Sequence, residues 1–140
     1  MKGYAFGLWL LWALFCFRVL GQLVQHLHPV SFLPAFDVWQ SGVVPYEVLL
    51  CSQLLILLLM AFVSYRFSSN VVTPGRRLGI GLLWVGGLYF TLMLGRLIIG
   101  LFILPGHQWF GQWLPSLFHL VLALFIILPG IYHVRSDRSP

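Results

Sequence analysis

Charged residues are scarce in this chain, and acidic residues are almost absent. Of its 140 residues only 8% are charged and three are acidic, whereas 60% are hydrophobic. A soluble domain usually carries about 25% charged residues, so this sequence cannot cover a water-exposed surface and needs lipid as its solvent. The length allows one domain, which we expect to span residues 1–140, and no separate soluble module.

The chain also lacks the motifs that mark common enzymes and redox proteins. Its two cysteines, Cys16 and Cys51, lie inside apolar segments without a CxxC pair, so neither a disulfide scaffold nor a thioredoxin-like site is predicted. G-x-S-x-G, HExxH and Gly-rich phosphate-binding sequences are absent as well. No catalytic residue is therefore predicted, and the sequence favours a binding or structural role over an enzymatic one.

Long apolar runs dominate what the sequence does contain. Spanning the hydrocarbon core takes about 20 apolar residues in a helix, and four segments qualify: 4–26, 45–65, 78–104 and 115–132. No A-x-A-like cleavage site follows the first segment, so we expect it to remain as a helix. The predicted fold class is all-α, an integral membrane protein built as a four-transmembrane-helix bundle. Pro129-Gly130 is expected to kink or fray the last turn.

Basic residues gather at alternate ends of these segments. Connection 64–79 carries three arginines and the tail after Tyr132 carries two, whereas connections 29–44 and 105–114 carry no Lys or Arg. Because basic residues are enriched in cytoplasmic loops, we expect both termini in the cytoplasm of a multi-pass protein of the bacterial inner membrane. The basic residues flank helices and form no stripe, so the formal charge of +5 does not predict nucleic-acid binding. Membrane lipids are the expected partners.

The spacing of proline and arginine is similar in the two halves of the chain. An arginine precedes an outer proline by 11 and 9 positions, and a proline precedes an inner arginine by 21 and 20 positions (Arg18–Pro29, Arg96–Pro105, Pro45–Arg66 and Pro115–Arg135). Two hairpins of the same orientation, as in the parallel repeats of some transporters, would give this spacing. Any two membrane hairpins with proline outside and arginine inside would give it too, so both interpretations stay open.

Two arginines, Arg18 and Arg96, lie within apolar segments, unlike the other basic residues. Charge in hydrocarbon is costly and usually faces a protein interior or marks a function. At about 1.5 Å rise per residue, both lie roughly 15 Å inside the outer boundary. Arg18, Gln22 and His26 also share one helix face. We expect a ligand-binding pocket in the outer half of the bilayer, formed by Arg18, Gln22, His26, Glu47, Arg96 and His119.

The acidic residues of the outer side are the expected partners of these arginines. Asp37 lies in the first outer connection, and Glu47 lies in the first turn of the second helix, where the macrodipole favours a negative charge. We expect the two acids to pair with the two buried arginines. This requires the outer connection to fold onto the bundle, and such folding is favoured by its apolar residues Phe32, Leu33, Phe36, Val38 and Trp39.

Four of the five histidines also lie on the outer side. His26 and His28 form an H-x-H pair that could hold copper or zinc together with a third, distant ligand such as His107. His26 and His119 could instead be the axial ligands of a haem. In a third interpretation these histidines are structural or contact an organic ligand, and all three interpretations stay open.

Two short stretches resemble a known family. GRLIIG at 95–100, and less closely RVLG at 18–21, is similar to the Arg- and Gly-bearing helix of small four-helix membrane proteins of the DoxX type. The Gly-Lys pattern that usually follows is absent after both arginines. The resemblance implies a small four-helix membrane protein and transfers no site residue.

Three functional classes fit these features. The first is a protein that binds an amphipathic or anionic ligand, such as a quinone, a lipid headgroup or a redox cofactor, in the outer pocket. The second is a non-catalytic accessory or assembly subunit of a larger membrane complex, in which the polar residues only specify helix pairing. The third is a small transporter or channel, which would need a homodimer. Gly87, Thr91 and Gly95 share a face that could pack closely, within the bundle or between copies.

Overall fold

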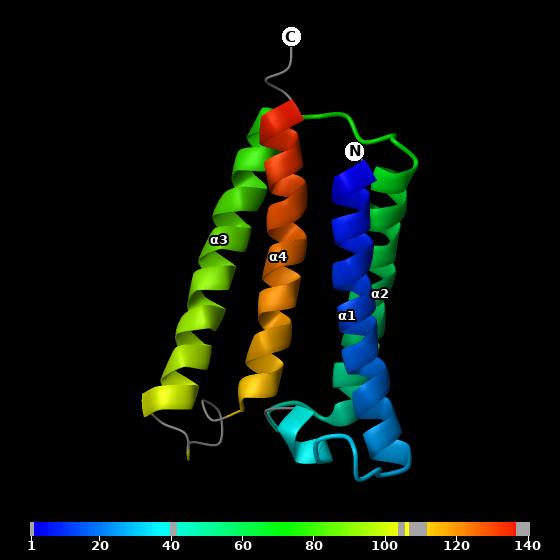
Figure 1. Cartoon of the computed structure of the whole chain (residues 1–140), viewed down its shortest axis with the longest axis vertical. Coiled ribbons are helices and arrows are strands. Elements are labelled where there is room, and N and C mark those ends of the chain that lie inside the picture. The colour runs from blue at the N-terminus through cyan, green and yellow to red at the C-terminus, as the bar shows by residue number, and fades with distance from the viewer. Residues whose placement is uncertain (1, 40–41, 104–105, 107–111, 137–140) are drawn as a thin grey trace.

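Four long helices make up the computed structural model, which describes residues 2–39, 42–103, 106 and 112–136. They are α1 (Lys2–Leu27), α2 (Tyr46–Ser68), α3 (Arg76–Ile98) and α4 (Trp113–Ser136), as Figure 1 shows. A short 3₁₀ helix, η1 (Phe36–Trp39), lies between α1 and α2, and a π-helical turn, η2 (Ile99–Ile103), continues α3. All four spans are long and apolar enough to cross a membrane. The prediction of an all-helical fold with four helices of membrane-spanning length is confirmed for the described residues.

The helix ends lie within four residues of the predicted ones, except the C-terminal end of the third helix. The third helix was expected to run to residue 104 as one α-helix, but α3 ends at Ile98 and changes to π-helical hydrogen bonding. The last turn of the fourth helix was expected to kink or fray at Pro129-Gly130, and α4 continues through Pro129 to Ser136 without fraying there. Membrane helices tolerate an internal proline where neighbouring helices bury it. Pro129 is buried, and Gly130 beside it packs against Leu83 of α3.

The helices form two hairpins. The α3–α4 pair has the most extensive packing, α1 packs against both α2 and α4, and α2 and α3 make almost no contact with each other. Glycines permit the close approach of α3 to α4. A Cβ atom added at Gly79 would lie 2.7 Å from Cβ of His133, and one at Gly86 would lie 2.7 Å from Cγ1 of Ile127. Small residues thus bring these helices together, as expected where hydrocarbon surrounds them.

The small-residue face predicted on the third helix is not the one that packs here. A Cβ atom at Gly87 or Gly95 would meet nothing within 4 Å, and Thr91 between them is exposed. The face of α3 that packs against α4 instead carries Gly79 and Gly86. The Gly87–Gly95 face is therefore free of contacts from this chain's described residues.

Candidate functional site

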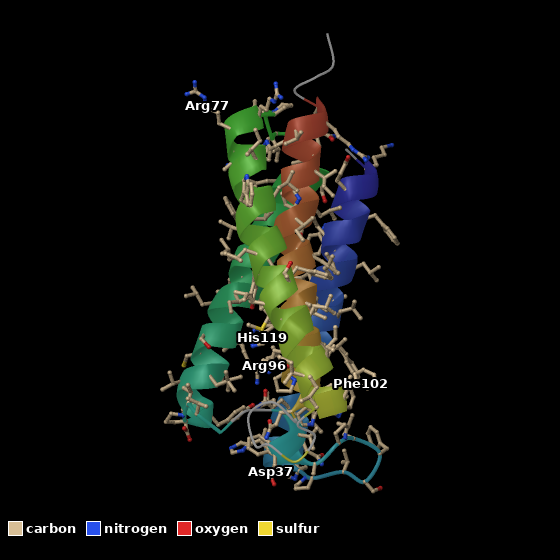
Figure 2. The ribbon with its side chains drawn as sticks, turned by 90° about the vertical axis from the view of Figure 1, so that its left-hand side faces the viewer. Asp37, Arg77, Arg96, Phe102 and His119 are labelled. Atoms are coloured by element: carbon tan, nitrogen blue, oxygen red, sulfur yellow. The ribbon has the colours of Figure 1, made fainter. Side chains whose placement is uncertain are left out.

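The polar residues of the predicted outer pocket lie at one end of the bundle. In Figure 1 the N-terminal end of α1, the C-terminal end of α4 and the α2–α3 connection are at the top, while η1, the C-terminal end of α3 and the N-terminal end of α4 are at the bottom. Figure 2 shows Arg96 and His119 in the lower half, Asp37 at the lower tip and Arg77 at the opposite end. Arg18 and Arg96 are only 6% and 8% exposed, respectively, although they lie in membrane-spanning helices. The bundle therefore buries both charges, as their sequence context indicates.

Arg18 is held by the folded outer connection. Its Nη2 donates a hydrogen bond of 3.1 Å to the backbone carbonyl of Trp39 in η1. Its guanidinium carbon lies 5.6 Å from the ring centre of Phe118 and 5.9 Å from that of Phe15, within the range of cation–π attraction. Nε of Arg18 has no hydrogen-bond partner among the described residues. The guanidinium is therefore enclosed mainly by aromatic rings and one carbonyl, and its Nε–H donor is unused.

Trp39 docks η1 against α1 because α1 carries a glycine there. A Cβ atom at Gly21 would lie 2.8 Å from Cη2 of Trp39, so the indole fits only against a residue without a side chain. Nε1 of the indole donates to the carbonyl of Pro34 at 2.9 Å, and the whole residue is 2% exposed. The α1–α2 connection thus folds onto the bundle. The sequence predicted this folding, but for an ion pair of Asp37 with an arginine rather than for the docking of Trp39.

The acids take no part in this arrangement. Asp37 and Glu47 are both exposed, and no ion pair involving either is found in the part of the chain that the structure describes. The expected pairing of Arg18 with a carboxylate is replaced by its bond to the carbonyl of Trp39. A carboxylate that stays at the water-facing end avoids the desolvation cost of a buried ion pair.

A hydrogen bond between two glutamine side chains joins α1 to α2. Nε2 of Gln53 donates to Oε1 of Gln22 at 3.2 Å, and both residues are buried. Nε2 of Gln22 and Oε1 of Gln53 have no further partner among the described residues. Gln22 was predicted as a site residue, whereas Gln53 was not. The sequence does mark Gln53, because it is an amide directly before the apolar run from Leu54 to Met60, within a predicted membrane-spanning segment.

A hydrogen bond between His119 and Tyr89 links α4 to α3. Its Nδ1 lies 2.6 Å from the hydroxyl of Tyr89, a hydrogen bond whose direction depends on the imidazole tautomer. His119 also lies within electrostatic range of both Arg18 and Arg96. Tyr46 of α2, whose hydroxyl is buried without a hydrogen-bond partner among the described residues, lies within such range of Arg18. All four helices therefore contribute a polar side chain to this buried polar cluster, formed by Arg18, Gln22, Tyr46, Gln53, Tyr89, Arg96 and His119.

Two predicted site residues lie outside the cluster. His26 is exposed, and its ring centre lies 4.4 Å from that of Tyr46 and 5.1 Å from that of Phe36, so it stacks between α2 and η1. Glu47 is exposed on the first turn of α2. His26 therefore serves as an aromatic contact between the outer connection and the bundle.

The histidines predicted as metal or haem ligands are His26, His28, His107 and His119. His28 is exposed, and His107 lies outside the described residues. Among the described residues no group of three or more His, Cys, Asp or Glu side chains is placed to hold a metal ion. Of the two histidines considered as haem ligands, His119 has its Nδ1 engaged with Tyr89 and His26 stacks on Tyr46.

Comparisons with protein-family models, curated proteins and solved structures found no match to this chain. The chemistry of the polar cluster itself indicates what it can bind. It combines permanent positive charge with buried hydrogen-bonding groups, and in a low-dielectric surrounding both interact most strongly with an oxygen-rich or anionic group.

Proposed function

We propose that this multi-pass membrane protein binds the oxygen-rich head of an amphipathic or anionic ligand in the buried polar cluster. The ligand class includes a lipid headgroup, a quinone or a redox cofactor. The observation that carries the proposal is the environment of Arg18, a buried guanidinium with a carbonyl contact, two aromatic neighbours and an unused Nε donor.

Arginine cannot remove its own charge by losing a proton. A guanidinium stays protonated in proteins, so burial in hydrocarbon leaves its charge to be balanced by a partner. Asp37 and Glu47, which could have supplied that balance, are exposed. An anionic head beside Arg18 would supply the missing charge, and it would accept a hydrogen bond from Nε.

The unsatisfied amides and hydroxyl support the same ligand class. Nε2 of Gln22 and the Tyr46 hydroxyl can donate, and Oε1 of Gln53 can accept. Buried polar atoms without partners are rare in native proteins and call for an explanation. A head with several oxygen atoms satisfies donors of this kind, which an apolar ligand cannot do.

In the orientation we propose, the cluster lies in the outer half of the bacterial inner membrane and both termini are cytoplasmic. The support is the asymmetry of Lys and Arg between the connections. We also propose that the α1–α2 and α3–α4 hairpins are parallel repeats, since the two hairpins carry similar Pro and Arg spacing.

The binding proposal is tested by co-purification. Arg18→Gln and His119→Ala are compared with the wild type and with Arg77→Gln, a control that removes one exposed positive charge at the other end of the bundle. Circular dichroism verifies folding, absorbance and metal analysis report cofactors, and mass spectrometry of organic extracts identifies lipids and quinones. We expect the two cluster variants to fold but to lose a bound amphiphile that Arg77→Gln keeps. Unchanged bound material in both cluster variants would refute the proposal.

An accessory-subunit function is the second candidate, and the Gln22–Gln53 hydrogen bond favours it. Such a bond between helices can serve only to specify pairing. A dimeric transporter or channel is the third, favoured by the uncovered Gly87–Gly95 face of α3. Cross-linking in native membranes separates them, since the second predicts heterologous partners and the third predicts a homodimer.

A further inference from the structure

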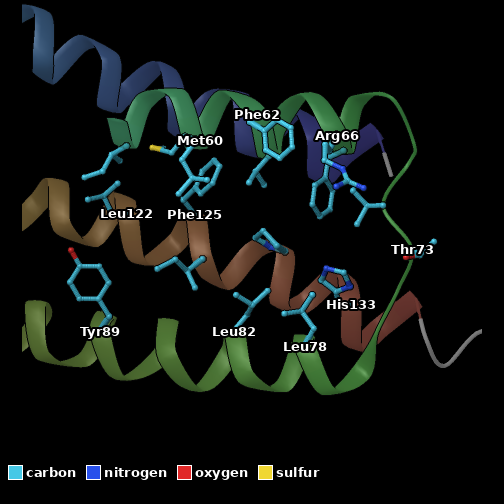
Figure 3. A pocket seen from close by; sticks show the side chains of 17 residues that line it. Met60, Phe62, Arg66, Thr73, Leu78, Leu82, Tyr89, Leu122, Phe125 and His133 are labelled. Atoms are coloured by element: carbon cyan, nitrogen blue, oxygen red, sulfur yellow. The ribbon is translucent and has the colours of Figure 1, made fainter. Parts of the chain in front are cut away.

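A cleft lies between α2 and α3 and runs from the α2–α3 connection as far as Tyr89, the one residue that it shares with the polar cluster as defined above. It has a volume of about 640 Å³, within the range of about 300–1,000 Å³ typical of ligand pockets. Its walls come from α2 and α3, which make almost no contact with each other, and α4 forms its floor (Figure 3). Leu59 of α2, Leu82 of α3 and Ile126 of α4 are typical of its mainly apolar lining.

The polar residues of the cleft lie mostly at one end. Arg66 of α2 and His133 of α4 line it near Thr73 of the α2–α3 connection, as Figure 3 shows. Nδ1 of His133 accepts a hydrogen bond of 3.1 Å from the backbone N–H of Gly75, so its Nε2 carries the proton of the neutral ring and is a donor. This end of the cleft therefore offers a cation and a hydrogen-bond donor, whereas the rest offers hydrocarbon.

The cleft has the length of one leaflet of a bilayer. Along α2 its lining runs from Ile56 to Arg66, and along α3 from Leu78 to Tyr89. At about 1.5 Å per residue these stretches measure roughly 15 and 16 Å, which is half of the hydrocarbon core of about 30 Å. The apolar groove thus begins at the membrane interface and ends near the midplane, as an acyl chain of one leaflet does.

The described charged residues at this end are all basic. The described residues of the helix ends and connection here carry exposed basic side chains, namely Lys2, Arg66, Arg76, Arg77 and Arg135, while the described acids, Asp37 and Glu47, lie at or near the opposite end. Clusters of Lys and Arg next to membrane helices attract anionic lipid headgroups. The electrostatic complement of this end is therefore a negatively charged headgroup.

We propose that the α2–α3 cleft binds one anionic phospholipid, with an acyl chain between α2 and α3 and the phosphate on Arg66. An apolar groove of this size within hydrocarbon is filled by lipid chains, and Arg66 selects among headgroups. Phe62 holds the guanidinium in place, since its ring centre lies 5.9 Å from the Arg66 guanidinium carbon. The headgroup position at Arg66 lies at the opposite end of the bundle from Arg18, and the inference does not depend on the function proposed for the polar cluster.

Native mass spectrometry of the purified full chain tests this proposal, with phosphatidylglycerol and phosphatidylcholine of identical acyl chains as probes. The wild type should retain one phosphatidylglycerol in preference to phosphatidylcholine. Arg66→Gln should lower that preference about fivefold, the size expected for one basic residue near a charged surface. Arg77→Gln is the matched control, since it removes the same charge at the same end outside the cleft lining, and it should change the preference less.

A second measurement tests the apolar groove itself. Phosphatidylglycerol with a photoreactive acyl chain should cross-link to cleft residues such as Leu59 and Ile126 in wild-type protein. Leu82→Trp should reduce these cross-links by filling the cleft, whereas Leu88→Trp, on the exposed face of α3, should not. Equal effects of Arg66→Gln and Arg77→Gln, cross-links spread evenly over the exposed helix faces, or a homodimer that carries no lipid would each overturn the proposal.

Discussion

The contact between α3 and α4 at Gly79 yields a prediction whose size follows from the structure. A Cβ atom at this position would lie 2.7 Å from Cβ of His133 and 2.9 Å from the backbone nitrogen of Val134. Neither atom can rotate away, because one is backbone and the other is attached directly to it, so the helices would have to separate. We expect Gly79→Ala to lower the free energy of unfolding by about 1–3 kcal/mol, the usual cost of overpacking.

Gly87→Ala is the matched control on the same helix. Nothing lies within 4 Å of its Cβ position, and alanine favours a helix over glycine by up to about 1 kcal/mol. The two substitutions should therefore change stability in opposite directions, or Gly87→Ala should leave it unchanged. Equilibrium unfolding of the detergent-solubilised variants, followed by circular dichroism, measures both. Equal losses in the two variants, or an unaffected Gly79→Ala, would refute the close approach of α3 and α4 at Gly79.

Three further predictions concern the polar residues and the orientation. Gln53→Leu should destabilise the fold by about 1–3 kcal/mol in the same assay, because it leaves the buried Gln22 without its partner, whereas replacing both glutamines by leucine should restore most of that loss. Glu47→Gln should change stability by less than about 0.5 kcal/mol, as is usual for an exposed side chain without an ion pair, and a clear loss of thermal stability would show that this carboxylate has a buried partner. In a background without the native cysteines, Ser69→Cys should react with a membrane-impermeant thiol reagent only from the cytoplasmic side and Ser31→Cys only from outside; the reverse pattern would invert the proposed orientation.

Much of the fold could be predicted because the membrane constrains helices through local properties. A span needs about 20 apolar residues, so four runs in the sequence predicted four helices, and the structure contains four of spanning length. The polar residues Arg18, Gln22, Arg96 and His119 were expected in the protein interior, since lipid cannot satisfy their hydrogen-bonding groups. Arg18, Gln22 and Arg96 are buried. His119 is partly buried and forms a hydrogen bond with Tyr89.

The partners of these residues could not be read from the sequence. Arg18 is expected to pair with an acid from charge alone, but its partner is the carbonyl of Trp39, which Gly21 allows to approach. The bond from Gln53 to Gln22 joins positions 31 residues apart and depends on how α1 and α2 face each other. Local spacing places a side chain on a helix face but gives no information about the neighbour of that face.

Sequence by itself therefore determined the number, approximate bounds and polar faces of the helices, because hydropathy and the 3.6-residue period are local properties. Only the tertiary structure decided which neighbour each helix face packs against. Apart from the few polar residues, apolar side chains surround these helices on nearly every side, so no amphipathic pattern marks the packing faces. Packing shape decides it instead, bringing Gly79 and Gly86 rather than Gly87 and Gly95 against α4. The same packing leaves the cleft between α2 and α3 open.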